Sequence, residues 1–345
     1  MARRRTLDMG PSLALPTRSP GRQSTAAQAR YEAELHAWCE ALIQLDSRQE
    51  SKISSRGWCY LLEPYGLDKG DFDKAQKLIN DCRKDGHLPL DFTADDDARA
   101  FETYEDVGAS KPSVEAAGWV RAVLTAHTRY TPWSFWRDQT WYVQLVVEKI
   151  DIKNLFRSTC ARFRIPTANA RGWADINMRA DMMRRFAEAE ARGQLPVLLY
   201  CGDFDPAGLL ISDTLRKQLE DLSAAVGWDP CDLTIDRFGL TRAFIDQHNL
   251  TWIKGLKTGS GGDLADPRHP DRWKTYVQDY IAEHGARKVE ANVLVTIPEV
   301  ARQLLLDTIT KYLAADAPEV WEVAVADPRG EFERVLRQQL LKVLR

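Results

Sequence analysis

The chain has 345 residues, of which 44% are hydrophobic and 28% are charged, and its net charge at pH 7 is −3. That length favours two domains, the charge argues against a protein that is basic throughout, and no apolar run approaches the roughly 20 residues that span a bilayer. The six cysteines have no CxxC spacing, which argues against a zinc site or a disulfide framework, so we expect a cytoplasmic protein.

The first 30 residues carry six arginines and one acid, Asp8, a net charge of +5, so the remaining chain carries −8 (−3 − 5). Residues 1–28 have no apolar periodicity and are expected to form a disordered basic tail. Such a tail could contact phosphates, or it could be a solvated leader with no role.

The next segment predicts a small helical domain. An apolar stripe at helical spacing runs from Tyr31 to about Leu45, and two further helices are expected at 53–62 and 72–84. Residues 88–92 could form a short strand that opens a wing. Three helices followed by a strand outline a winged helix, so 29–101 is predicted to be a winged-helix DNA-binding domain. A small helical bundle is the alternative.

The third of these helices has a basic face. Lys74, Lys77 and Lys84 lie opposite its apolar residues. We take these lysines as candidate DNA-binding residues, since such charges can neutralise phosphates. A merely solvated face is the competing interpretation.

The second half of the chain alternates strands and helices. Residues 102–117 are polar, contain Gly and Pro and read as a linker, so the second domain is expected at 118–345 with a helical extension at its C-terminal end. Its expected strands are 143–147, 165–170 and 196–201, and its expected helices are 154–163, 175–192 and 206–222. This order predicts an α/β domain with a mostly parallel sheet flanked by helices.

Acidic residues follow two of the strands. Glu148 ends the first, and Asp203 and Asp205 follow the third, where Asp205 precedes Pro206 as a helix N-cap would. The carboxyl ends of parallel strands share one edge of a sheet, so the three carboxylates are expected to meet there. Hard oxygen ligands without His or Cys suit Mg²⁺ or Mn²⁺. Ordinary turn and cap chemistry is the alternative.

These motifs carry a resemblance. The segments Val146–Lys149 (VVEK) and Gly202–Gly208 (GDFDPAG) look like those of a Toprim domain. Together with Arg56-Gly57-Trp58-Cys59-Tyr60, they make the chain resemble the topoisomerase VI A subunit and the meiotic double-strand-break protein, and most closely their short bacterial or prophage-borne relatives.

The resemblance implies a winged helix followed by a Toprim domain. It implies Glu148, Asp203 and Asp205 as ligands of Mg²⁺ or Mn²⁺, with Glu148 also catalytic. It further implies that Tyr60 attacks a DNA phosphodiester, that Arg56, one helical turn earlier, steadies the phenolate or phosphate, and that the protein is a homodimer.

Other positions add candidate residues or depart from the family pattern. Arg171, at the end of the second strand, joins the candidate DNA-binding residues. Asn292 stands where relatives tend to have a second acid, which leaves the role of Glu290 open. The 259–262 loop (GSGG) lacks the GK[ST] of a phosphate-binding loop, so any ATPase would be a separate partner.

Three functions remain open from the sequence. The first is a Mg²⁺-dependent DNA-cleaving enzyme that uses Tyr60. The second is a hydrolytic Toprim nuclease of a defence system, in which water attacks. The third is a non-catalytic module that binds or regulates DNA. In each case the partner is double-stranded DNA, which would place the protein at the nucleoid.

Overall fold

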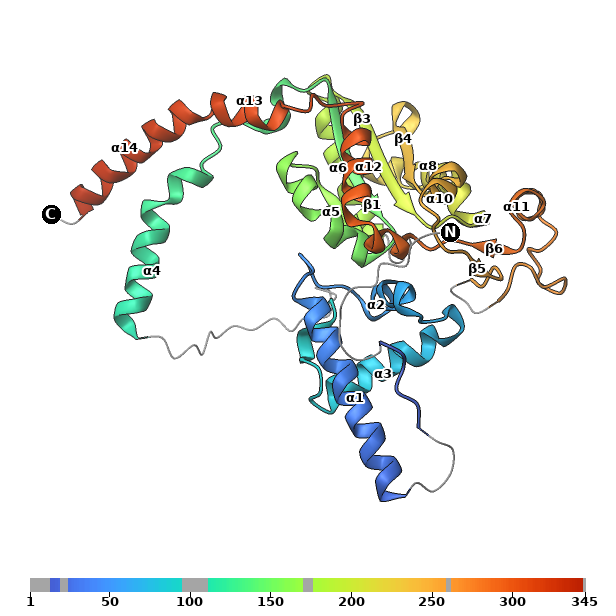
Figure 1. Cartoon of the computed structure of the whole chain (residues 1–345). Helices are drawn as coiled ribbons and strands as arrows, with labels where there is room; N and C mark the ends of the chain where they lie inside the picture. The colour runs from blue at the N-terminus through green and yellow to red at the C-terminus, as the bar shows by residue number, and fades with distance from the viewer. Residues whose placement is uncertain (1–12, 19–23, 95–110, 170–175, 259–261, 344–345) are drawn as a thin grey trace.

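The computed structural model describes residues 13–18, 24–94, 111–169, 176–258 and 262–343. Its centre is a sheet of four parallel strands in the order β2-β1-β3-β4 (Figure 1). The strands are β1 (Trp141–Val147), β2 (Thr167–Asn169), β3 (Leu195–Gly202) and β4 (Thr234–Gly239). The two central strands, β1 and β3, are almost wholly buried, as expected for near-continuous apolar runs covered on both faces. The predicted α/β class and parallel sheet are confirmed.

Helices cover the sheet. Helix α5 (Ile150–Arg162) packs against α12 (Pro298–Ile309), while α6 (Ile176–Glu190) packs against α8 (Ile211–Glu220). Further α-helices and strands of this region are α7 (Pro206–Leu209), α9 (Ser223–Val226), α10 (Arg242–Gln247), α11 (Thr275–His284), α13 (Ala317–Ala324) and the antiparallel pair β5 (Ile253–Lys254) and β6 (Arg287–Lys288).

The helix expected over 154–163 begins earlier, at Ile150, as α5, and two elements after β3 also differ from the sequence prediction. The helix expected over 206–222 is interrupted at Leu210, between α7 and α8. Strand β4 was not predicted, because Asp236 and Arg237 interrupt its apolar pattern. Both side chains find partners: Asp236 accepts from Tyr312, and Arg237 donates to the Gly208 carbonyl.

The N-terminal region consists of α1 (Thr25–Asp46), α2 (Ser55–Leu62) and α3 (Phe72–Lys84). The predicted strand at 88–92 is wrong, because Leu90–Phe92 forms a 3-10 turn after Pro89. Phe92 stacks on Trp58 with ring centroids 4.6 Å apart, so packing on α2 fixes this segment. The β pairing here is one isolated bridge between Ile53 and Thr93, and the described residues therefore show three helices without a paired wing.

The predicted boundaries also shift. Helix α1 begins at Thr25 under a Ser24 cap, and Leu13 is buried, so the expected tail at 1–28 overlaps ordered structure. The expected linker at 102–117 overlaps α4 (Pro112–Leu124), whose first residue is a proline, a favourable helix start. Residues 102–110 lie outside the described part of the chain.

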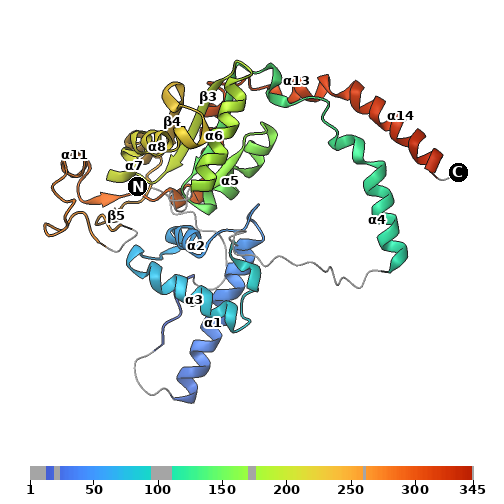
Figure 2. The same ribbon diagram turned by 180° about the vertical axis from the view of Figure 1, so that it is seen from behind.

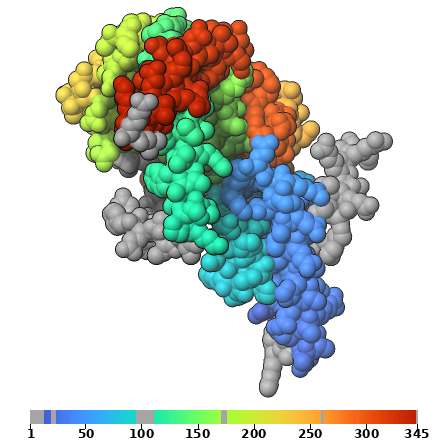
Figure 3. All heavy atoms as spheres, turned by 90° about the vertical axis from the view of Figure 1, so that its left-hand side faces the viewer, coloured from blue at the N-terminus to red at the C-terminus, as the bar shows by residue number. Residues whose placement is uncertain are grey.

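Helices α4 and α14 (Ala326–Val343) project from the body of the molecule (Figures 1 and 2). Tyr130, six residues after the end of α4, stacks on Phe332 of α14 with ring centroids 4.4 Å apart. Trp119 on α4 remains 69% exposed. Figure 3 shows α4 and α14 on one face of the molecule. No helix in the described ranges is both long and apolar enough to cross a membrane.

Candidate carboxylate site

Glu148 and Asp203 lie side by side at one edge of the sheet. Strands β1 and β3 are neighbours, with Val147 opposite Cys201, which is the condition on which the expected meeting of the acids depended. Glu148 follows β1 and Asp203 follows β3, and the Asp203 backbone N–H donates to Glu148 Oε2 over 2.9 Å. The pairing of the two strands therefore sets the separation of the two acids.

Gly202 allows this approach. A Cβ atom at Gly202 would lie 2.8 Å from Glu148 Oε2 and 2.6 Å from the Tyr200 hydroxyl oxygen. Both distances are too short for a real Cβ atom, so a side chain at position 202 would displace the ends of the Glu148 and Tyr200 side chains.

Lys149, for which no role was predicted, joins the two carboxylates. Its Nζ atom lies 2.9 Å from Glu148 Oε1 and 2.9 Å from Asp203 Oδ2. Burial acts to lower the pKa of Lys149, but the adjoining Asp203 and Glu148 carboxylates outweigh it and hold that pKa above its ordinary value. The ammonium therefore stays charged. In the sequence, only its position directly after Glu148 indicated a role for Lys149 at this site.

Asp205 has a different local role. It is the N-cap of α7, as predicted, and its Oδ1 accepts the Gly208 N–H over 2.6 Å. A Cβ at Gly208 would collide with the Asp203 carbonyl oxygen, so this turn also requires glycine. Burial raises the pKa of Asp205.

Glu148 and Asp203, the two acids that contact Lys149, lie in different environments. Asp203 is 4% exposed, and burial, with repulsion from Glu148 and Asp205, raises its pKa to about 7 against the opposing effect of Lys149. Burial also acts to raise the pKa of Glu148, but Lys149 and the Asp203 N–H outweigh it and leave that pKa below its ordinary value. Adjacent carboxylates held at different pKa values are typical of functional sites, although ion-pair networks also produce them.

Tyr60 and Arg56 of α2, the predicted catalytic pair, both contact a further acid, Glu290. The Tyr60 hydroxyl donates to Glu290 Oε2 over 2.9 Å, and Arg56 donates to both carboxylate oxygens over 3.1 and 3.3 Å. Burial acts against ionisation of Glu290, but Arg56 lowers its pKa to about 2. Tyr60 is fully buried, and burial, with the Glu290 charge, raises its pKa well above the ordinary value. The phenol is therefore a neutral donor to an ionised carboxylate.

Three consecutive residues connect this pair to the sheet. Glu290 holds Tyr60 and Arg56, the Ala291 N–H donates to Asp203 Oδ1 over 2.8 Å, and Asn292 donates to Asp151. From the sequence, the role of Glu290 stayed open. Asn292 was noted only because it stands where relatives tend to have an acid, and no role was predicted for it. Their positions beside Asp203 come from the Phe204–Val289 bridge, which aligns this segment with the end of β3.

Asp151 fixes the start of α2. Its two oxygens accept from the Ser54 N–H and the Ser54 hydroxyl, each over 2.6 Å. Asp151 is 2% exposed, and burial raises its pKa. The N-terminal helices are thus attached to the sheet domain through buried polar contacts beside Glu148 and Asp203.

The predicted DNA-binding lysines lie on the surface of α3. Lys74 pairs with Asp71 over 2.7 Å and Lys84 pairs with Asp81 over 3.2 Å, while Lys77 is exposed. The face therefore carries charges of both signs. Arg171 lies outside the described residues.

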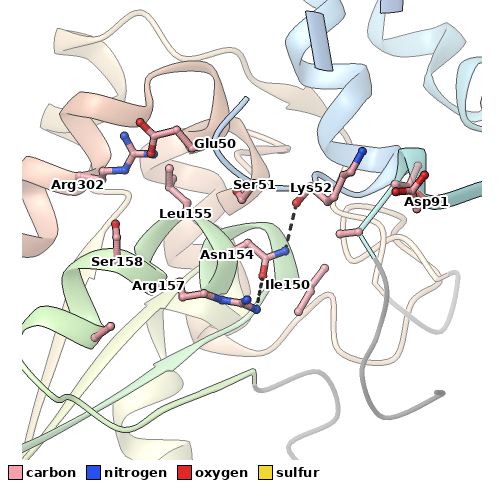
Figure 4. A pocket seen from close by; sticks show the side chains of 13 residues that line it. Glu50, Ser51, Lys52, Asp91, Ile150, Asn154, Leu155, Arg157, Ser158 and Arg302 are labelled. Carbon is pink, nitrogen blue, oxygen red and sulfur yellow. Dashed lines mark hydrogen bonds and ion pairs between the residues drawn. The ribbon is translucent and has the colours of Figure 1, made fainter. Parts of the chain in front are cut away.

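A separate cavity of about 480 Å³ lies between α5 and the segments at 50–52 and 91–94 (Figure 4). Asn154 donates to the Lys52 carbonyl across it, and the Arg302 guanidinium pairs with Glu50 over 2.6 Å. None of the predicted catalytic residues lines it.

The carboxylates can be compared with the needs of a metal ion. In the described part of the chain, no three His, Cys, Asp or Glu side chains are arranged to hold one. Lys149 lies between Glu148 and Asp203, and one Asp205 oxygen accepts from Gly208. The donor chemistry still suits Mg²⁺ or Mn²⁺, because all three side chains offer hard oxygens.

Known proteins offer no further guide to this site: the chain matches no family model, no curated protein and no solved structure.

Proposed function

We propose that the protein is a divalent-metal-dependent enzyme that cleaves phosphodiester bonds in double-stranded DNA. The observation that carries the proposal is the pairing of Glu148 with Asp203 at the ends of adjacent parallel strands, with the Asp203 N–H on the Glu148 carboxylate. Ligand sites of open α/β sheets are typically found at this edge.

The proposal assigns a role to each acid. Asp203, Asp205 and Glu148 would hold Mg²⁺ or Mn²⁺. When bound, the ion would neutralise charge on the phosphate and on the leaving oxygen. Glu148 is also the candidate to accept a proton, since its carboxylate is ionised and partly exposed.

The structure favours water over Tyr60 as the attacking group. Tyr60 is fully buried, its hydroxyl donates to Glu290, and its pKa is raised. Attack by Tyr60 would require the phenol to leave Glu290 and lose its proton, whereas hydrolysis leaves the α2 contacts intact. We therefore favour a hydrolytic Toprim-type nuclease over a topoisomerase-like reaction that forms a phosphotyrosyl bond.

The finer architecture belongs to the same proposal. The N-terminal helices would act as a winged-helix-like DNA-binding unit, with Lys74, Lys77 and Lys84 against the phosphates. A homodimer would give two cuts on one duplex. Strand passage, if the protein performs it, would need a separate ATPase subunit.

Incubation of supercoiled plasmid with protein and Mg²⁺ tests the proposal. We expect nicked or linear DNA with free ends, lost in Glu148→Gln and Asp203→Asn and retained in Tyr60→Phe, with Tyr65→Phe as the matched control. A protein–DNA adduct that Tyr60→Phe abolishes would establish tyrosine attack instead. Cleavage that survives both acid substitutions would refute the site.

A further inference from the structure

Each of the two central carboxylates divides its oxygens in the same way. Glu148 Oε2 accepts the Asp203 N–H over 2.9 Å, and Asp203 Oδ1 accepts the Ala291 N–H over 2.8 Å. Lys149 Nζ takes the other oxygen of each, Glu148 Oε1 and Asp203 Oδ2, over 2.9 Å. The two oxygens that are not committed to backbone are therefore the two that the ammonium holds.

We propose that Lys149 is a built-in counter-ion which keeps Glu148 and Asp203 in place without metal and which a divalent ion must displace in order to bind. The inference rests on the proposed function insofar as it takes these acids to be metal ligands. It adds a regulatory residue that sets how tightly the site takes up its ion.

Charge explains why the lysine is needed. Asp203 is almost wholly buried beside the Glu148 carboxylate, which repels its charge, and a buried charge without a partner is costly. The Asp203 side chain is only 6% exposed, and that of Lys149 is 28% exposed. The ammonium thus offsets charge from inside while its own side chain reaches solvent.

Geometry explains why displacement is feasible. Lys149 is the N-cap residue of α5, so its backbone is held by the helix whatever its side chain does. A lysine ammonium is a point charge on a flexible four-carbon stem and can leave without moving that helix. Release of the ammonium frees Glu148 Oε1 and Asp203 Oδ2, two hard oxygens that suit a divalent ion.

Competition of this kind predicts opposite effects for two substitutions. Lys149→Met keeps the length of the stem and removes the competing charge, so Mn²⁺ should bind more tightly. Lys149→Arg keeps the charge and offers a fork that grips carboxylates through two N–H groups, so Mn²⁺ should bind more weakly. Lys153→Met, one helical turn along α5, is the matched control.

Calorimetric titration of the full-length variants with Mn²⁺ measures these affinities, and thermal unfolding without metal accompanies it. We expect Lys149→Met to bind Mn²⁺ at least about tenfold more tightly than the parent chain. A tenfold change is about 1.4 kcal/mol, which is less than the cost of leaving a buried charge without a partner. Lys149→Met should also melt at a lower temperature without metal and regain more stability than the parent at saturating Mn²⁺. Lys153→Met should match the parent in both measurements.

The outcomes separate this inference from the proposed function. Equal or weaker Mn²⁺ binding by Lys149→Met would overturn the displacement while leaving metal-dependent cleavage standing. Failure of both the parent and Lys149→Met to bind Mn²⁺ would overturn metal use and the displacement together. If Lys149→Met does not fold, Lys149→Arg decides: weaker binding supports the displacement, and equal or tighter binding overturns it.

Discussion

The Glu290 cluster makes a quantitative prediction about stability. Glu290 accepts from Tyr60 and Arg56 across the contact between α2 and the sheet domain, and its pKa falls from 4.5 to about 2. Its side chain is 13% exposed, so solvent screens the interaction little. One pKa unit is worth 1.36 kcal/mol, and the ionised form of Glu290 therefore contributes about 3 kcal/mol to folding at pH 7.

The sign fixes the pH window. A depressed pKa means that the folded protein favours the ionised form, so the contribution is complete above the unfolded value of 4.5 and is lost as the pH falls toward about 2. Glu290→Gln should therefore lower the free energy of unfolding by about 3 kcal/mol at pH 7 and by about 2 kcal/mol at pH 3.5.

Urea denaturation followed by tryptophan fluorescence at the two pH values measures this difference, because Trp58 lies on α2. Glu283→Gln is the control, since the Glu283 side chain is 76% exposed. An equal loss at both pH values, or a loss at pH 7 no greater than that of Glu283→Gln, would refute the argument that an ionised Glu290 attaches α2 to the sheet.

The other contacts give further predictions. Gly202→Ala should destabilise the protein by about 1–3 kcal/mol, because the new methyl group meets Glu148 Oε2, whereas Gly70→Ala, which meets nothing within 4 Å, should change the unfolding free energy by less than about 0.5 kcal/mol. Asp151→Ala should cost about 1–3 kcal/mol in urea denaturation, because the N–H and hydroxyl of Ser54 lose their acceptor. Tyr60→Phe should keep plasmid cleavage while lowering the unfolding free energy by about 1.5–3 kcal/mol, the range for a hydrogen bond to a charged group; loss of cleavage without loss of stability would instead indicate a chemical role.

The sequence by itself determined the strands that carry the site. The apolar runs before Glu148 and Asp203 could be read because a strand buried on both faces needs nearly continuous β-forming residues. Their alternation with helices then predicted a parallel sheet, which places both acids at one edge. Asp205 could be read as a cap because N-caps and a following proline are local features.

The sequence was less informative where a distant partner decides the conformation. Residues 88–92 read as a strand, but Phe92 packs on Trp58 and the segment forms a turn. Strand β4 was not predicted, because Asp236 and Arg237 interrupt its apolar pattern and find their hydrogen-bond partners in distant segments.

Only the tertiary structure decided what surrounds the acids. Lys149 stands next to Glu148 in the sequence, yet its role depends on Asp203, which the pairing of β1 with β3 brings beside it. Tyr60 and Glu290 lie 230 positions apart, and only the packing of α2 against the sheet domain joins them. Local patterns can place a carboxylate at the end of a strand, but its counter-ion and hydrogen-bond donors come from whichever segments fold against it.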